Sequence, residues 1–130
     1  MNQRPPLWRM KRHQINVSIE DCDVFIAELQ QHINTFPVLG ILYENILKFS
    51  KVEKMIYTAL LNPTTKREIY PRLLAKYDEL LEDELDFNND QVAECVIPEG
   101  QYLRNCEHGL KHRNILKAVC DAGVEGVEIV

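Results

Sequence analysis

Residues 71–85 read PRLLAKYDELLEDEL, and this stretch carries a strong helical periodicity within the 130-residue chain. Its apolar side chains recur at helical spacing, at Leu73, Leu74, Tyr77, Leu80, Leu81 and Leu85. That spacing places them on one face of an amphipathic helix. Pro71 suits a first helical position, where its missing N–H costs nothing. The sequence therefore predicts a helix whose apolar stripe lies in the core.

Three more helices are expected, over residues 21–34, 46–60 and 101–122. In the first, Phe25 and Leu29 are four residues apart and share one face of the helix. In the last, Gly109 weakens the middle, and Gly123 is a natural residue to follow the helix end.

Short strands are predicted between and beyond these helices. HQINVSI (13–19) alternates apolar and polar residues, QVAECVI (91–97) reads as a second strand, and VEGVEIV (124–130) resembles a closing strand. FPVLGILY (36–43) is a continuous apolar run that fits either a buried strand or the first turn of a helix. We therefore expect an α+β fold, a single helix-rich domain with a few short strands, and keep an all-α helical bundle as the alternative.

The amino-terminal segment differs in composition from the rest of the chain. Residues 1–13 are expected to form a basic extended arm, because Pro5 and Pro6 disfavour helix, and residues 14–130 to form one globular domain. The candidate interaction residues of the arm are Arg4, Leu7, Trp8, Arg9, Lys11 and Arg12. The alternative is a disordered tail. Seven acids and no base occupy residues 78–90, so this block could compete for the arm.

Composition and charge exclude several classes of protein. The net charge is −5, which disfavours a nucleic-acid binder that acts through its whole surface. No apolar run approaches the roughly 18 residues that a membrane helix needs. Four cysteines without close pairs resemble reduced thiols, so we expect an intracellular protein, nuclear or cytoplasmic.

Residue types that bind metals gather in the last third of the chain. The zinc candidates are Cys95, Cys106, His108, His112 and Cys120. The alternative is that the histidines are exposed and the cysteines act as small buried apolar residues, because no Cys-x-x-Cys pair is present. Cys22 lies between Asp21 and Asp23, which oppose a reactive thiolate. No catalytic residue and no cofactor are assigned.

Residues 15–45, INVSIEDCDVFIAELQQHINTFPVLGILYEN, resemble the opening of DEDD-type, Werner-like 3′–5′ exonuclease domains. In that family a buried strand ends in an Asp-x-Glu pair that binds catalytic metal ions. At that place this chain has Leu42-Tyr43-Glu44, so Glu44 matches and the Asp is missing. The resemblance implies a degenerate site without nuclease activity.

Residues 25–81 are similar to the amino-terminal helical domain of TFIIS-type transcription elongation factors. The similarity runs through Phe36-Pro37 and ends at Leu80-Leu81. It implies docking of short segments of partner proteins.

We expect a non-enzymatic protein-interaction protein, an adaptor or scaffold in a nucleic-acid-processing or transcription assembly. Its partner would be a protein, with no strong case for direct binding of nucleic acid and none for a membrane. The alternatives are a metal-dependent exonuclease-like protein with an incomplete site, using Glu44 with acids of residues 78–90, and a small zinc-binding protein.

Overall fold

The computed structural model describes residues 8–94 and 98–130. Its elements, in chain order, are β1 (Trp8–Met10), α1 (Arg12–Thr35), a 3₁₀ turn η1 (Pro37–Leu39), α2 (Gly40–Leu61), α3 (Ile69–Ala93), α4 (Glu99–Glu125) and β2 (Val127–Ile129). The helix-rich fold predicted from sequence is confirmed. Several boundaries differ.

The strand predicted over residues 13–19 is wrong, because these residues form the first turns of α1. Ile15, Val17 and Ile19 alternate with polar residues, as in a strand. Ile15 and Ile19 are also four residues apart, which is helical spacing. Ile15 is 1% exposed, whereas Val17 is 39% exposed. The alternation was therefore part of a helical pattern, and Cys22 lies inside α1 rather than at a helix start.

The apolar run over residues 36–43 is not a buried strand. Pro37 begins η1, and α2 follows directly from Gly40. Val38 is 69% exposed and Ile41 is 71% exposed. The run turns the chain from α1 into α2 at an exposed end of the molecule, so its hydrophobicity did not indicate burial.

Residues 71–85 form a helix with a buried apolar stripe, as predicted. Leu73, Tyr77, Leu80 and Leu81 are buried, and Leu74 and Leu85 are partly buried against the same core. The helix begins at Ile69, two residues before Pro71, and continues to Ala93. The strand predicted over residues 91–97 is therefore wrong for residues 91–93, while Cys95 and residues 96–97 lie outside the described residues.

Glycines in α4 allow close packing against α3. Gly109 does not interrupt α4, contrary to the weakening predicted from the sequence. Because it has no side chain, α3 can approach closely: a Cβ added at Gly109 would lie 3.0 Å from Leu81 Cδ1. Gly123 is also inside the helix, against the ring of Tyr70. The helix ends instead at Glu125, and the capping Gly126 that follows has a φ of 105°, which other residues rarely adopt.

The closing strand is present as β2, although residues 124–125 of the predicted range still belong to α4. β2 pairs in parallel with β1. The register places Arg9 beside Glu128, and the guanidinium Nε donates a hydrogen bond of 3.1 Å to Glu128 Oε2. Met10 packs against the core, and the Arg12 N–H donates to the Val130 carbonyl at 2.9 Å. Residues 8–12 of the basic arm therefore contribute to the domain itself.

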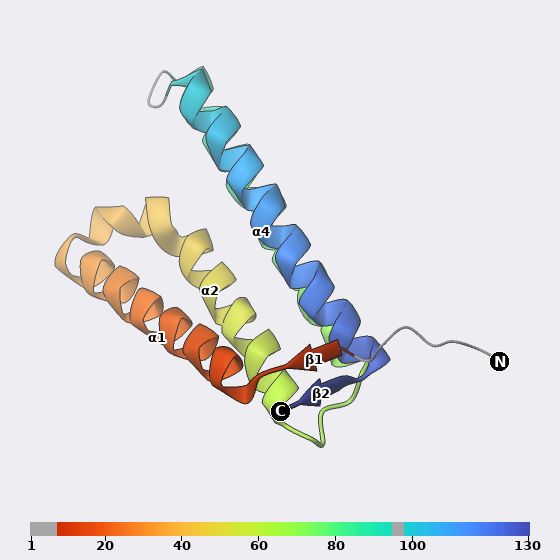
Figure 1. The fold of residues 1–130 in the computed structure, drawn as a ribbon. Coiled ribbons are helices and arrows are strands. Elements are labelled where there is room, and N and C mark those ends of the chain that lie inside the picture. Colours follow the sequence, from red (N-terminus) through yellow and green to blue (C-terminus); the bar gives the residue numbers. More distant parts are fainter. Residues whose placement is uncertain (1–7, 95–97) are drawn as a thin grey trace.

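The four helices form two hairpins, α1–α2 and α3–α4, which diverge from a common base (Figure 1). The two strands lie at that base, and α2 packs against α3. The fully buried Ile15, Ile56, Leu116 and Cys120 belong to one core cluster with the stripe of α3.

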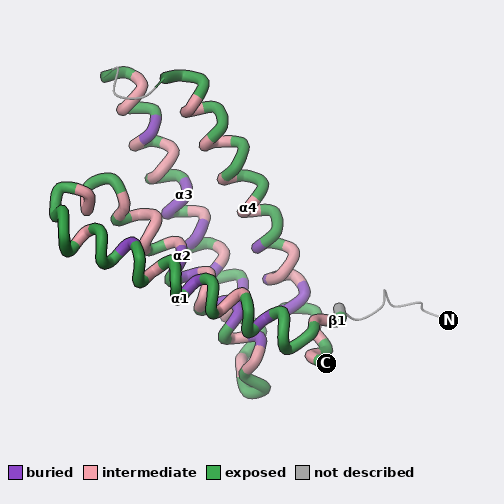
Figure 2. The backbone as a smooth tube through the Cα atoms, turned by 60° about the vertical axis from the view of Figure 1, so that its left-hand side comes forward, coloured by how far each residue is buried: buried purple, intermediate pink, exposed green. Residues whose placement is uncertain are grey.

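Away from the base the helices are less covered. In α4 the buried residues are Leu116, Cys120, Ala122 and Gly123, all in its second half, and in α2 none precedes Ser50 (Figure 2). Within the described residues, no helix is long and apolar enough to cross a membrane.

Candidate binding cleft

A cleft of about 610 Å³ opens between the two hairpins and takes residues from all four helices. Its apolar and aromatic lining consists of Cys22, Phe25, Ile46, Phe49, Tyr77, Leu81, Leu85 and Gly109. Its polar lining consists of Ser18, Asp21, Ser50, Glu53, Glu84, Asn88, Asn105, His108 and His112. The volume is within the range of about 300–1,000 Å³ that ligand sites occupy.

A row of four rings crosses the cleft from α2 through α3 to α4. The ring centroids of Phe49 and Tyr77 are 5.1 Å apart, and those of Tyr77 and His112 are 6.3 Å apart. The rings of His108 and His112 stack with centroids 6.5 Å apart. His108 and His112 share one face of α4 because they are four residues apart. The row gives the cleft a continuous aromatic wall.

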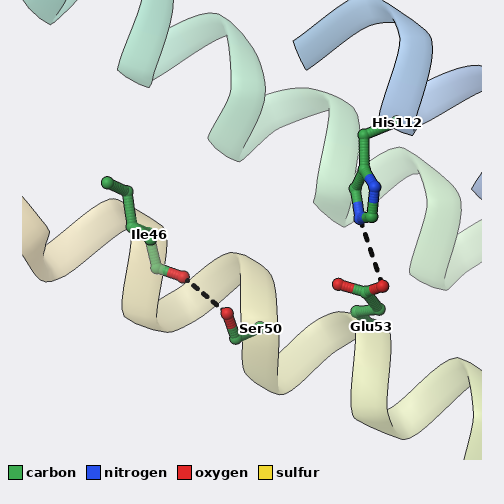
Figure 3. Close-up of polar contacts among 4 residues, drawn as sticks. All are labelled: Ile46, Ser50, Glu53 and His112. Atoms are coloured by element: carbon green, nitrogen blue, oxygen red, sulfur yellow. Dashed lines mark hydrogen bonds and ion pairs between the residues drawn. The ribbon is translucent and has the colours of Figure 1, made fainter. Parts of the chain in front are cut away.

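One polar contact joins α2 to α4 across the cleft. Glu53 Oε1 lies 3.1 Å from His112 Nε2 (Figure 3). This hydrogen bond raises the pKa of His112 above its ordinary value, although burial opposes the rise. On the same helix, the Ser50 hydroxyl donates to the Ile46 carbonyl at 3.1 Å, which satisfies the donor of a buried serine.

The side-chain amides of Asn88 on α3 and Asn105 on α4 also line the cleft. The Asn88 amide donates to Glu84 Oε1 at 3.2 Å and to the Glu84 carbonyl at 2.8 Å. Its own oxygen accepts a hydrogen bond of 3.1 Å from Asn105 on α4, whose oxygen accepts one from Gln101. Burial raises the pKa of Glu84, although hydrogen bonds from Asn88 and Asn45 oppose this. The network holds α3 and α4 together where few apolar residues are buried.

Cys22 is an inert thiol at the inner wall. Burial, followed by the negative charges of Glu53, Asp23 and Asp21, raises its pKa to about 11. The flanking acids therefore act in the predicted direction, but burial is the larger cause. At neutral pH the thiol stays protonated.

The zinc candidates are distributed over separate places. His108 and His112 line the cleft, Cys106 is half-buried, and Cys120 is 2% exposed in the core. Cys95 lies outside the described residues. Within the described ranges, no group of three or more His, Cys, Asp or Glu side chains is arranged to hold a metal ion.

The acids connected with the nuclease resemblance also have separate partners. Glu44 forms an exposed ion pair of 3.1 Å with Lys48, one turn along α2. Asp78 accepts two hydrogen bonds from Arg113, at 2.8 and 2.9 Å, which join α3 to α4. Asp78 therefore links α3 to α4 through Arg113.

The described candidate residues of the arm, Arg9, Lys11 and Arg12, lie away from the cleft, at the base. Arg9 is paired with Glu128, while the side chains of Lys11 and Arg12 are exposed. Arg4, Leu7 and the Trp8 side chain lie outside the described residues. A docking role for these residues stays a prediction.

Sequence reasoning missed most of the cleft. It assigned Phe25 and Tyr77 to apolar faces and His112 to zinc, but it gave no role to Glu53 or Asn88. The sequence does predict that Phe49 and Glu53 share one face of a helix, since they are four residues apart. The spacing does not predict which helix lies opposite that face.

Comparison with known proteins finds no matching family model, no similar curated protein and no similar solved structure. The resemblances to DEDD-type exonucleases and to TFIIS-type domains stay predictions.

Proposed function

We propose that this chain is a non-enzymatic protein-interaction protein that holds a helical segment of a partner in the cleft between its hairpins. The observation that carries the proposal is the cleft itself, which has an aromatic wall and residues from every helix. An amphipathic helix laid into a hydrophobic groove is a common mode of peptide recognition.

Exposure of apolar side chains supports this use of the cleft. Phe25 lines it and is 43% exposed, although a phenylalanine gains roughly 1.5–3 kcal/mol when it is fully buried. No residue of α2 before Ser50 and none of α4 before Leu116 is buried, so these parts of the two helices have room for another element against them. A partner helix seated there would cover Phe25 and the ring row together.

The setting follows from the same proposal. We place the protein inside the cell, in the nucleus or cytoplasm, as an adaptor in a nucleic-acid-processing or transcription assembly. The basic arm would add a second contact to the partner. We class the fold as helix-rich α+β, because the β1–β2 pair completes its base.

Site-specific photocrosslinking tests the proposal. Benzoylphenylalanine would replace Phe25, which lines the cleft, or its neighbour Val24, which is 58% exposed and does not line it. The full chain with either substitution is then irradiated in extract from its source organism, and the cross-linked peptides are identified by mass spectrometry. We expect one partner segment, helical and apolar on one face, to cross-link at position 25.

A blocking variant adds the control. Ser18 is half-buried on the α1 side of the cleft, and Ser18→Trp would fill part of it. This variant should abolish the cross-link at position 25 while its thermal unfolding stays close to that of the parent. Equal cross-linking at position 24, or a cross-link that persists in a folded Ser18→Trp protein, would contradict the proposal.

A further inference from the structure

The charges that line the cleft are unbalanced. Asp21, Glu53 and Glu84 come from three different helices, and none of the described lining residues is Lys or Arg. His108 and His112 are the only lining side chains in the described residues that can become cationic. The described lining therefore carries more acidic than basic groups, which favours a cationic occupant.

The three carboxylates are incompletely neutralised within the chain. Glu53 has His112 as its partner, at 3.1 Å. In the described part of the chain, neither Asp21 nor Glu84 has a cation within 4.0 Å. Glu84 accepts hydrogen bonds from neutral amides only, and it is partly desolvated. A cation that entered the cleft would supply the charge that these groups lack.

The aromatic row stands beside these acids. The rings of Phe49, Tyr77 and His112 succeed one another at 5.1 and 6.3 Å, and Glu53 contacts the last of them. A planar guanidinium stacks on aromatic faces and donates paired hydrogen bonds to carboxylates. The combination of rings and acids fits arginine better than an apolar side chain.

The acids that an occupant of the cleft can reach come from different helices. Asp21 is on α1, Glu53 on α2 and Glu84 on α3, and the half-exposed Phe25 lies among them. The exposed acids Asp83, Asp86 and Asp90 are on the opposite face of α3 and do not contribute. A segment that carries basic and apolar side chains at helical spacing complements these lining groups, so charge complementarity favours a peptide over a free small molecule.

We propose that the cleft selects a basic amphipathic helix of a partner protein, whose arginine side chains pair with Asp21 and Glu84 beside the ring of Phe49. This inference rests on the proposed function and specifies the chemistry of its partner. The apolar face of the incoming helix would cover Phe25, and its basic residues would face the acids that line the cleft.

A matched peptide pair tests the inference. The probe is a synthetic helix of about 14 residues with Leu at i, i+3, i+4 and i+7 and Arg at the remaining charged positions. Its control carries citrulline, the neutral isostere, at every Arg position. Titration calorimetry on the full chain should show at least a tenfold weaker affinity for the citrulline peptide, because charge-assisted hydrogen bonds are lost.

Protein variants then locate the contact. Glu84→Gln and Asp21→Asn should each weaken the Arg peptide several-fold, with the larger loss for Glu84→Gln because it is more desolvated. Glu28→Gln removes an exposed acid of α1 outside the cleft and should change the affinity by less than about twofold. Thermal unfolding confirms that each variant is folded.

Several results would overturn the inference. These are equal affinity for the two peptides, a loss with Glu28→Gln as large as that with Glu84→Gln, and binding of hexylguanidinium as tight as that of the Arg peptide. Dimerisation of the chain through the cleft, reversed by the peptide, would assign the cleft to a second copy instead. A cross-link at position 25 to a segment without basic residues would retain the proposed function while refuting the arginine-specific inference.

Discussion

Replacing Gly123 by alanine tests the packing at the base, from which both hairpins diverge. A Cβ at this position would lie 2.6 Å from two carbons of the Tyr70 ring and 2.7 Å from a third. Carbon atoms pack at about 3.5–4.0 Å, so the ring must move by roughly 1 Å. Tyr70 is 4% exposed and has little room for that movement.

The magnitude follows from two opposing effects. Overpacking a filled core costs about 1–3 kcal/mol, and the severe overlap places this site near the upper value. Alanine recovers about 1 kcal/mol of helix propensity relative to glycine. We therefore expect Gly123→Ala to lower the free energy of unfolding by about 2 kcal/mol, which for a domain of this size lowers the Tm by roughly 6–10 °C.

Thermal unfolding followed by circular dichroism measures this change. Gly100→Ala is the matched control, because its added Cβ would meet only the flexible Arg104 side chain, at 3.6 Å. The control should be neutral or slightly more stable than the parent. In a Tyr70→Leu background, Gly123→Ala should cost less. A Gly123→Ala protein as stable as the parent would refute the close packing of α4 against Tyr70.

Three more predictions concern the contact between Glu53 and His112, the β1–β2 pair and the core. Hydrogen bonding to Glu53 raises the folded-state pKa of His112, so the stability that it contributes is complete below the unfolded pKa and is lost as pH rises through the folded pKa. His112→Gln should remove this part of the pH dependence of the Tm, which lies above the ordinary histidine pKa of about 6.5. An unchanged profile would show that the contact does not form. Deletion of residues 1–12 should lower the Tm by several degrees, because it removes β1 and the packing of Met10, and it should weaken partner cross-linking at position 25; retention of both would make the arm dispensable. Leu116→Ala should cost about 2–5 kcal/mol in chemical denaturation, since Leu116 is fully buried, and a loss below 1 kcal/mol would contradict its place in the core.

The helices were largely predictable, because their apolar spacing reflects contacts that each helix makes with the core. The stripe of α3 is the clearest case, since its burial matches its periodicity. Prediction was wrong where a short pattern fitted two periods, as at Ile15, Val17 and Ile19. Over residues 36–43 the sequence left a buried strand and a first helical turn open. The structure has the helical turn, with Val38 and Ile41 exposed between α1 and α2.

The cleft could be predicted only in part. The sequence predicts which lining residues share a helix face. Phe49 and Glu53 are one turn apart on α2, and so are His108 and His112 on α4. Which faces meet depends on how α2 crosses the α3–α4 pair, and that geometry comes from tertiary packing. The close approach at Gly109 and Gly123 contributes to it, although in the sequence these glycines indicated a weakened helix and a helix end.

Amide chemical-shift mapping tests the cleft as the partner site most directly. The ¹⁵N-labelled full chain is titrated with the Arg peptide, and the shifted amides are assigned to positions. The proposal predicts changes concentrated at Ser18, Phe25, Phe49 and Glu84, which line the cleft from three helices. Val24, which is exposed outside the cleft, should be unaffected. Shifts clustered around Val24 or at the β1–β2 base, with the cleft amides unchanged, would contradict it.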